Sequence, residues 1–209
     1  MDVYLSRLPH CLQVLDMLLK SRGYRGHPYA NKTSIEILEE AHAKSISIGT
    51  LLSVLLAAGS STLGLAWVDP VFDAAKGREV MTSAYQLKNA IDKFTTKAES
   101  TLIVCYAKLS PDAQRMSQSV GNKVQLMTCQ SLAVSLKDHV LVPRHTALTE
   151  EQAAEFERAR NIKRSQLPML RVNDPIVAWN NWQVGTIVRI ERPQGPFWRV
   201  VRPSDKESK

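Results

Sequence analysis

The strongest constraint on the fold comes from the order of hydrophobic patterns along the chain. Residues 63–68, 101–107 and 124–134 are rich in aliphatic and β-branched residues and are bounded by turn formers, as β-strands are. Residues 80–94 and 111–119, which lie between these runs, look helical. Because strands that alternate with helices form a sheet covered by helices, we expect an α/β or α+β domain in the first two thirds of the chain.

The segments before these strands are expected to be helical. Five leucines recur at steps of three and four residues, which places them on one face of a helix: Leu5, Leu8, Leu12, Leu15 and Leu19. We expect Ser6 to cap the start of this helix, Pro9 to lie in its first turn and Gly23 to end it. Residues 34–43 and 51–58 are expected to form two further helices.

The last seventy residues show a different pattern, with short runs separated by prolines. Residues 140–142 look like a strand, and residues 185–191 and 197–201 look like the two strands of a hairpin. Thr149 and Gln152 have the spacing of a capping box, which predicts a helix that starts there. This change of pattern predicts a second, smaller α+β domain.

Charge and cysteine content narrow the classes of function. The formal net charge of +7 suits a partner that carries phosphates or acidic surface, and it is spread over both parts of the chain. Cys11, Cys105 and Cys129 lie far apart, so they indicate neither a zinc site nor a disulfide framework, and a reducing compartment fits best. Residues 45–68 carry no charge, but polar residues and Gly59 interrupt them, so we interpret them as buried core and not as a membrane span.

One set of motifs in the last third resembles a known family. The chain reads Leu141-Val142-Pro143-Arg144-His145, then Leu148-Thr149-Glu150-Glu151, then a segment that ends Ser165-Gln166-Leu167-Pro168, then Asp174-Pro175. This order and spacing resemble the C-terminal assembly domain of the fifth-largest subunit of eukaryotic nuclear RNA polymerases, whose archaeal counterpart consists of that domain alone. In this family pattern a strand follows, matched by residues 176–179, and Asn180-Asn181-Trp182 replaces a segment that usually carries a glycine.

The first half resembles the same family more weakly. The matching segments are Ser6-Arg7-Leu8, Ser21-Arg22-Gly23-Tyr24 and Leu65-Ala66-Trp67-Val68, while residues 26–62 match nothing. The resemblance implies an α+β chain with an endonuclease-like α/β jaw domain at residues 1–137, an assembly domain at 138–203 and a polar tail at 204–209. Such divergence leaves room for an isoform that serves one polymerase only.

The resemblance also implies a function without catalysis by the chain itself. The expected protein is a polymerase subunit that docks on the largest subunit and neighbouring small subunits, with its jaw beside downstream duplex DNA, in the nucleus, or in the nucleolus if it is specific to polymerase I. No cofactor, metal, membrane or small-molecule substrate is expected. The implied polymerase interface comprises Val142, Pro143, Arg144, His145, Ser165, Gln166, Leu167, Pro168, Asp174 and Pro175.

Candidate DNA contacts in the first domain are Lys88, Lys93 and Lys97, although a solvated helix face explains them equally well. Contacts of this kind would be non-specific and salt-sensitive, because phosphates carry no sequence information. A cluster in the second domain could form a protein interface, a core or a stacking surface for single-stranded nucleic acid, with the first two favoured. It comprises Trp179, Trp182, Trp198, Arg189, Arg192, Arg199 and Arg202.

Two other classes of function remain as alternatives. One is a free-standing nucleic-acid-binding protein that uses the same assembly domain outside a polymerase. The other is a metal-dependent nuclease, for which Pro111-Asp112 is present but the carboxylate-x-lysine motif expected after it is missing. His145 has no paired nucleophile in any recognisable motif, so we interpret it as a packed or interface histidine.

Overall fold

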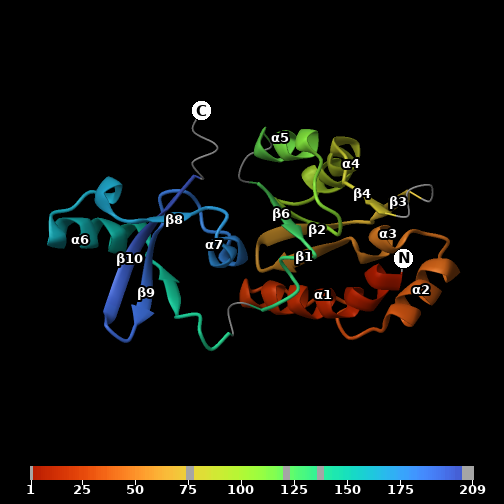
Figure 1. The fold of residues 1–209 in the computed structure, drawn as a ribbon, viewed down its shortest axis with the longest axis horizontal. Helices are drawn as coiled ribbons and strands as arrows, with labels where there is room; N and C mark the ends of the chain where they lie inside the picture. The colour runs from red at the N-terminus through yellow and green to blue at the C-terminus, as the bar shows by residue number, and fades with distance from the viewer. Residues whose placement is uncertain (1, 74–77, 120–122, 136–138, 204–209) are drawn as a thin grey trace. The chain divides into compact units, whose positions relative to one another are not determined.

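The computed structural model describes residues 2–73, 78–119, 123–135 and 139–203 (Figure 1). The chain is α+β, as expected, and it divides into two compact units, Met1–Val134 and Ser135–Lys209. The expected boundary between residues 137 and 138 lies outside the described residues, and so does the expected tail at 204–209. No helix among the described residues is long and apolar enough to cross a membrane.

The first unit is built on a four-stranded sheet in the order β1-β2-β5-β6. Strands β2, β5 and β6 are parallel, and β1 pairs antiparallel with β2 at one edge. A separate two-stranded sheet joins β3 and β4. The elements are α1 (Asp2–Ser21), α2 (Ser34–Ala43), α3 (Ile48–Leu52), β1 (Val54–Ala58), β2 (Ser61–Val68), β3 (Val71–Asp73), β4 (Arg78–Val80), α4 (Ala84–Thr95), β5 (Ser100–Cys105), α5 (Pro111–Ser119) and β6 (Val124–Thr128).

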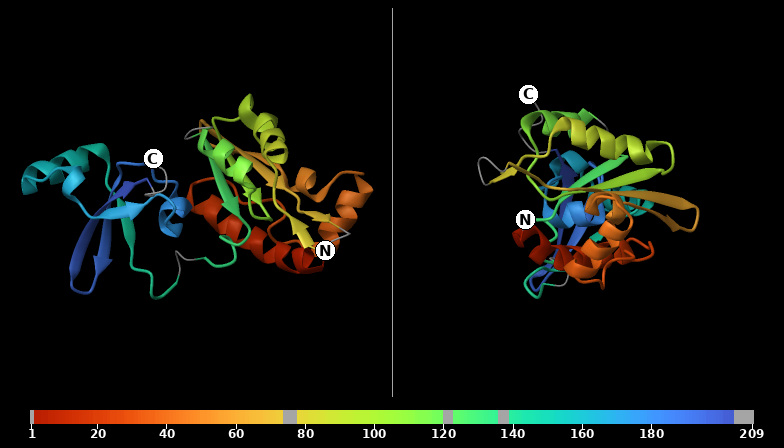
Figure 2. Two further views of the ribbon diagram at one scale, coloured as in Figure 1. Left: turned by 45° about the horizontal axis from the view of Figure 1, so that its top comes forward. Right: turned by 90° about the vertical axis from the view of Figure 1, so that its right-hand side faces the viewer.

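Helices cover both faces of this sheet, with α1, α2 and α3 on one side and α4 and α5 on the other (Figures 1 and 2). Alternate residues of β2 and β5 face α4 and α5, where Ala66 and Ile103 pack against Leu87 of α4. Gly64 allows the close approach of α4 to β2, since a Cβ there would lie 2.5 Å from the Phe94 Cβ. The unit is therefore a three-layer α/β/α arrangement.

Helix α1 forms where the leucine spacing predicts it, but it starts earlier than expected. It begins at Asp2, so Ser6 and Pro9 lie inside the helix and the expected cap at Ser6 is wrong. Proline has no N–H to donate to the carbonyl four residues before it, and the Leu5 carbonyl accepts a hydrogen bond from the Ser34 hydroxyl of α2 instead. The Leu5 carbonyl, which Pro9 leaves without a helical donor, thus links α1 to α2.

The end of α1 agrees with the prediction. Gly23 has φ +84°, its N–H donates to the Lys20 carbonyl, and the Tyr24 N–H donates to the Leu19 carbonyl. These two bonds form a Schellman motif, which favours glycine because the left-handed conformation is strained for other residues.

Three predicted elements of the first unit are corrected by the structure. Residues 51–58 do not form one helix, because α3 ends at Leu52 and β1 starts at Val54. The helix expected from residue 80 starts at Ala84, where Ser83 and Gln86 form a capping box, and β4 precedes it. The strand expected at 124–134 ends at Thr128. Short apolar runs fit a buried helix and a buried strand equally, so their pattern does not separate the two.

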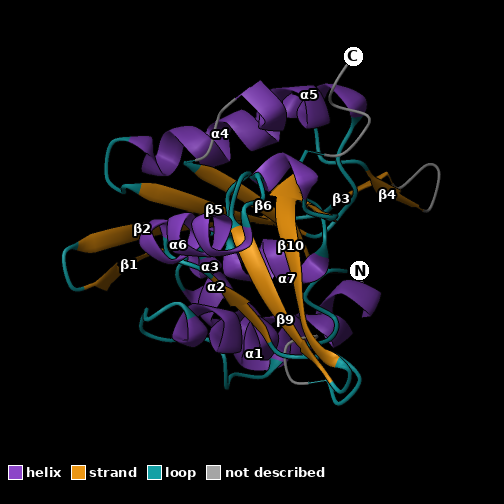
Figure 3. Ribbon diagram, turned by 90° about the vertical axis from the view of Figure 1, so that its left-hand side faces the viewer, coloured by secondary structure: helices purple, strands orange, loops and turns teal. Residues whose placement is uncertain are grey.

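The second unit contains a four-stranded sheet in the order β7-β9-β10-β8, with a helix on each face. Its central strands β9 and β10 and its helices α6 and α7 are labelled in Figure 3. Strand β10 pairs antiparallel with β9 and parallel with β8, and β7 pairs antiparallel with β9. Helix α6 packs on one face through Ala153 against Ile187 and Val200, and α7 on the other through Val177 against Val188. The elements are β7 (His145–Ala147), α6 (Glu150–Arg160), the 3-10 helix η2 (Arg164–Gln166), β8 (Met169–Arg171), α7 (Pro175–Asn180), β9 (Ile187–Arg192) and β10 (Gly195–Arg202).

The predicted hairpin is confirmed as β9 and β10, and the capping box of α6 is confirmed by both of its hydrogen bonds. Two predicted strands are wrong. Residues 140–142 form a turn, and residues 176–179 belong to helix α7, which Asp174 caps and Pro175 starts. Asn181 ends α7 with φ +55°, a conformation that asparagine tolerates, so the missing glycine is compatible with the turn.

Candidate interaction surfaces

The first group of predicted interface residues lies at the β7 edge of the second sheet. The Arg144 carbonyl accepts a hydrogen bond from the Glu191 N–H, which extends the β7–β9 ladder by one residue. His145 donates from Nδ1 to the Pro143 carbonyl at 2.6 Å, because a carbonyl oxygen can only accept. Val142 and Pro143 are half-buried, and the Arg144 side chain is exposed. The backbone at this edge is therefore held in place while Arg144 faces solvent.

The segment before this edge is unusually apolar for an exposed turn. Val140 and Leu141 are 97% and 83% exposed. Among the described residues, β7 pairs only with β9, so its other side is open. An open strand edge beside exposed aliphatic side chains is a typical place for a partner to bind. Sequence analysis missed Val140 and Leu141 as surface residues because it placed this segment in a strand.

The second group of predicted interface residues lies around β8. Ser165, Gln166 and Pro168 are exposed, whereas Leu167 is buried in the core between α6 and the sheet. The Leu167 side chain packs inside the unit, and the exposed part of this group is Ser165, Gln166 and Pro168. The Pro168 carbonyl accepts a hydrogen bond from the Val200 N–H.

Asp174 and Pro175 start helix α7. The Asp174 Oδ1 accepts a hydrogen bond from the Ile176 N–H at 2.9 Å, and Pro175 occupies the first turn, where its missing N–H costs nothing. The same two residues also line a pocket of about 510 Å³ with Arg171 and Arg199. Asp174 thus has a structural role of its own, which any test of docking must keep intact.

The sheet order separates the two groups of predicted interface residues. Strands β7 and β8 are the two opposite edges of the sheet, with β9 and β10 between them. Three strand spacings amount to about 14 Å. The structure therefore does not bring all ten residues to one spot, and a single partner surface would have to span the sheet to contact both edges.

The tryptophan and arginine cluster is also divided. Trp182 is half-buried in the core on the α7 face, and Trp179 of α7 is buried. Trp198 packs on the α6 face against Phe156, with ring centroids 4.3 Å apart. The guanidinium groups of Arg160 and Arg189 lie 5.7 and 5.9 Å from the Trp198 ring centroid. Trp182 and Trp198 lie on opposite faces of the sheet, so the three tryptophans do not form one stacking surface.

An ion-pair network that sequence analysis missed holds the α6 side together. Arg164 pairs with Glu150 at 2.6 Å and with Glu157 at 3.2 Å, and it donates to the Gly185 carbonyl. Hydrogen bonding to Glu150 is the main cause that raises the pKa of Arg164. The sequence shows acidic residues at Glu150 and Glu157, but Glu150 and Arg164 are fourteen positions apart, so local spacing does not predict the pair.

The three lysines proposed to lie near DNA do not all lie on one side of α4. Lys88 and Lys93 are exposed on α4 and are about 140° apart around the helix axis, since each residue turns it by 100°. Lys97 follows the helix, and burial together with the Lys97 charge lowers the pKa of Lys93. Lys93 and Lys97 therefore lie near one another, and Lys88 lies on a different side of α4.

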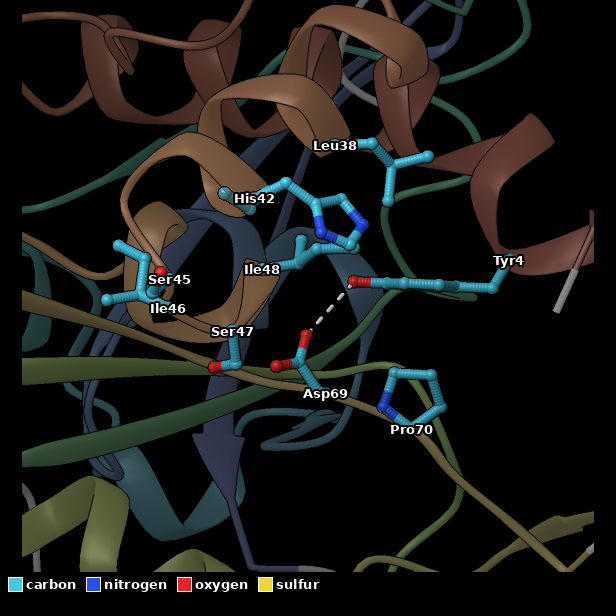
Figure 4. Close-up of a pocket in the computed structure, with 10 residues that line it drawn as sticks. Tyr4, Leu38, His42, Ser45, Ile46, Ser47, Ile48, Asp69 and Pro70 are labelled. Atoms are coloured by element: carbon cyan, nitrogen blue, oxygen red, sulfur yellow. Dashed lines mark hydrogen bonds between the residues drawn. The ribbon is translucent and has the colours of Figure 1, made fainter.

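A pocket of about 450 Å³ opens beside α2 and α3 in the stretch that resembles nothing (Figure 4). The Tyr4 hydroxyl points toward Asp69 and donates to it at 3.3 Å, and the Gly49 N–H donates to the other carboxylate oxygen at 2.7 Å. The Tyr4 hydroxyl in turn accepts from the Trp67 Nε1 at 3.2 Å, and burial raises the pKa of Tyr4. This hydrogen-bond chain fixes the wall of the pocket.

A metal-dependent nuclease would need a group of metal ligands, and the described part of the chain contains none. Asp112 lies on the first turn of α5, where it is exposed and pairs with Arg115 at 3.3 Å. Within the residues that the structure describes, no three His, Cys, Asp or Glu residues are grouped so that they could hold a metal ion.

Comparison with known proteins points to one family. A family described as RNA polymerase Rpb5, C-terminal domain, matches residues 134–201. The DNA-directed RNA polymerases I, II, and III subunit rpabc1 of Dictyostelium discoideum is 30% identical over 121 residues, which are 56% of this chain and 61% of that protein. The corresponding subunit RPABC1 of Caenorhabditis elegans is 31% identical over 105 residues, 48% of each chain.

An archaeal protein matches the second unit over nearly its whole length. The DNA-directed RNA polymerase subunit Rpo5 of Archaeoglobus fulgidus is 37% identical over 71 residues, which are 32% of this chain and 93% of the archaeal protein. With the eukaryotic relatives, by contrast, the match spans between about half and three fifths of their length. The family resemblance of the sequence motifs is thereby confirmed, and the chain belongs to the Rpb5 family of RNA polymerase subunits.

Proposed function

We propose that the chain is a non-catalytic subunit of a DNA-directed RNA polymerase. The observation that carries this proposal is the match to the archaeal subunit, of which the chain covers 93%. A relative that consists of little more than this domain is named as a polymerase subunit, which supports the same role for the second unit. The second unit then supplies the attachment to the polymerase.

Attachment is proposed to occur through the β7 edge and the turn before it. Exposed Val140 and Leu141 provide apolar area, the free side of β7 provides backbone hydrogen-bonding groups, and Arg144 provides a charge at the rim. The partner is the largest subunit of the polymerase, with neighbouring small subunits beside it. The exposed residues of the β8 edge, Ser165, Gln166 and Pro168, form a second contact at the opposite edge of the sheet.

The first unit is proposed to be the jaw that lies beside downstream duplex DNA. The candidate contacts are three of its exposed lysines, Lys88, Lys93 and Lys97, and contacts of lysines with phosphates are non-specific and weaken with salt. The chain acts in the nucleus, as expected for a subunit of a eukaryotic nuclear polymerase, and in the nucleolus if it belongs to polymerase I alone.

A second candidate is a free-standing nucleic-acid-binding protein. It is favoured by the net charge of +7 and by the exposed side chains of Arg160, Arg189 and Arg192 in the second unit. It differs from the polymerase subunit in one observable, because it would not be recovered with large polymerase subunits in fixed proportion.

The deciding experiment is an affinity purification of the tagged full chain in mild salt, with its partners identified by mass spectrometry. Recovery of one set of large polymerase subunits in equal amounts would support the subunit role and name the enzyme. Recovery of several sets would support a subunit shared between polymerases. Absence of polymerase subunits, with nucleic acid recovered in their place, would overturn the proposal in favour of the free-standing protein.

A further inference from the structure

A pocket of about 610 Å³ lies at one end of the first sheet. It is formed where β5 and β6 end, by Tyr106 to Lys108 and by Cys129 and Gln130, and it is closed by the first half of α1. Strands β5 and β6 are parallel, so their carboxyl ends meet at the same edge. In open parallel sheets this edge is where ligands bind.

Two cysteines share the wall of this pocket. The Cys11 thiol of α1 donates a hydrogen bond to the Cys129 carbonyl, with 3.6 Å between Sγ and O, although 118 positions separate the two residues in the sequence. Hydrogen bonding with the Cys129 side chain, followed by the Arg7 guanidinium, lowers the pKa of the Cys11 thiol against the effect of burial. Neither cysteine is in a disulfide, and both side chains belong to the described residues.

The rim of the same pocket is basic. Arg7 and Lys108 are exposed there, and no ion pair found among the described residues involves either of them. His10 also lines the pocket and donates from Nε2 to the Ala133 carbonyl at 2.7 Å. Two exposed cations thus line the pocket together with Cys11 and Cys129, which are 3% and 5% exposed.

We propose that this pocket is a thiol-modification site, in which a small anionic disulfide such as oxidised glutathione converts Cys11 and Cys129 into an intramolecular disulfide. The inference goes beyond the role in the polymerase and does not depend on it. The third cysteine, Cys105, takes no part, because it does not line this pocket and packs in the core on the opposite face of the sheet. Burial also raises its pKa to about 12.

The exchange occurs in two balanced steps. The Cys11 thiolate attacks one sulfur of the small disulfide, whose S–S bond breaks, and the leaving thiolate takes up the proton that Cys11 gave up. The Cys129 thiolate then attacks the Cys11 sulfur of the mixed disulfide and releases the second small thiol in the same way. The two cysteines lose two electrons and two protons, and the small disulfide is reduced to two thiols.

The product would join α1 to the turn after β6 by a covalent bond. A disulfide between residues so far apart in the sequence restricts the unfolded chain strongly. The oxidised chain is therefore expected to have a higher Tm than the reduced chain, and the Cys11→Ser variant should show no such difference.

The experiment treats the folded full chain with glutathione buffers of increasing oxidised fraction, blocks the remaining thiols by alkylation and maps the peptides without reduction. The expected result is a Cys11–Cys129 disulfide with Cys105 alkylated. Cys129→Ser should trap glutathione on Cys11, and Cys105→Ser, the matched control, should oxidise as the natural chain does. Three alkylated cysteines in the most oxidising buffer, or a disulfide that includes Cys105, would overturn the proposal.

A second readout tests the basic rim. Oxidation by the anionic glutathione disulfide is compared with oxidation by cystamine, a small disulfide that carries positive charge. Replacing both Arg7 and Lys108 by alanine should lower the preference for glutathione about fivefold, the size of one charge contact near a protein surface. An unchanged preference, with circular dichroism that shows a folded chain, would contradict the role assigned to these two residues.

Discussion

Gly49 at the start of α3 is held so closely that no side chain fits. A Cβ at this position would lie 2.7 Å from the Asp69 Oδ2 and 2.8 Å from the Trp67 carbonyl oxygen. The carbonyl belongs to β2 in the middle of the sheet and cannot move aside. The Gly49 N–H also donates to Asp69, so a shift of the backbone would break this hydrogen bond.

Gly49→Ala should therefore lower the free energy of unfolding by about 1–3 kcal/mol, the usual cost of an overpacked site. Urea unfolding followed by circular dichroism measures it. The matched control is Gly59→Asn, at a glycine with open space around it and φ +60°, which asparagine tolerates. Equal losses in the two variants would contradict the steric explanation.

His27 is a buried histidine whose neutral form fits its surroundings. Its Nε2 donates to the Leu52 carbonyl at 3.0 Å, and its Nδ1 accepts from the Tyr29 N–H at 3.3 Å. Protonation would place a hydrogen on Nδ1 against that N–H. Burial is the main cause that lowers the pKa of His27 from its ordinary value of 6.5.

Stability should consequently fall as the pH drops below about 6.5, because the unfolded chain then binds a proton that the folded chain does not. Above this value both states are neutral and the contribution is complete. The slope for one group reaches at most about 1.4 kcal/mol per pH unit. Urea unfolding between neutral and mildly acidic pH measures it, and His27→Gln should flatten the curve. A natural chain whose stability rises on acidification would sink the prediction.

The carboxylate of Asp174 has two roles at helix α7: it caps the helix and it carries a charge at the surface. Asp174 caps the helix through the Ile176 N–H and lines a pocket with Arg171 and Arg199. Removing the side chain would remove the cap and the charge at once. Asparagine separates the two effects, since it caps a helix about as well as aspartate does.

Asp174→Ala is expected to cost about 0.5–2 kcal/mol of stability, and Asp174→Asn much less. If the charge itself contributes to docking, Asp174→Asn should weaken incorporation into polymerase while thermal unfolding stays unchanged. Thermal unfolding and co-purification of both variants test this. Full incorporation of Asp174→Asn would remove the Asp174 charge from the proposed interface.

The β7 edge is where the second unit is expected to meet the rest of the polymerase. Arg144→Glu reverses an exposed charge at this edge, and its backbone hydrogen bond to Glu191 is retained. Recovery of large polymerase subunits with this variant should fall several-fold, because like charges across an interface oppose binding. Arg158→Glu, on the exposed side of α6, is the matched charge reversal. Equal recovery with both variants would place the docking surface elsewhere.

The lysines of the first unit should act on DNA and not on assembly. Replacing Lys88, Lys93 and Lys97 by alanine is expected to leave incorporation unchanged and to weaken the hold on downstream duplex, mostly at low salt. Each lost phosphate contact should reduce the slope of log affinity against log salt by about 0.9. The single variant Lys88→Ala tests whether Lys88, which lies on a different side of α4 from Lys93, contributes to this hold on DNA. Loss of assembly in the triple variant would show that the two surfaces are misassigned.

Long periodic segments and local motifs could be predicted from the sequence, and short apolar runs could not. The predicted helix at residues 34–43 agrees with α2, and the Schellman motif at Gly23 and the capping box of α6 have the expected hydrogen bonds. Residues 51–58 and 176–179 were given the wrong structure. In such runs the neighbours on the sheet decide between helix and strand, and local pattern does not contain them.

The sequence by itself determined the α+β class, the family and the local turns, because each depends on residues close together in the chain. The tertiary structure decided what depends on residues far apart. Sheet order placed the two groups of predicted interface residues on opposite edges, with Leu167 in the core between α6 and the sheet. The packing of α1 brought Cys11 against Cys129 across 118 positions, a proximity that exists only once the strands are in register.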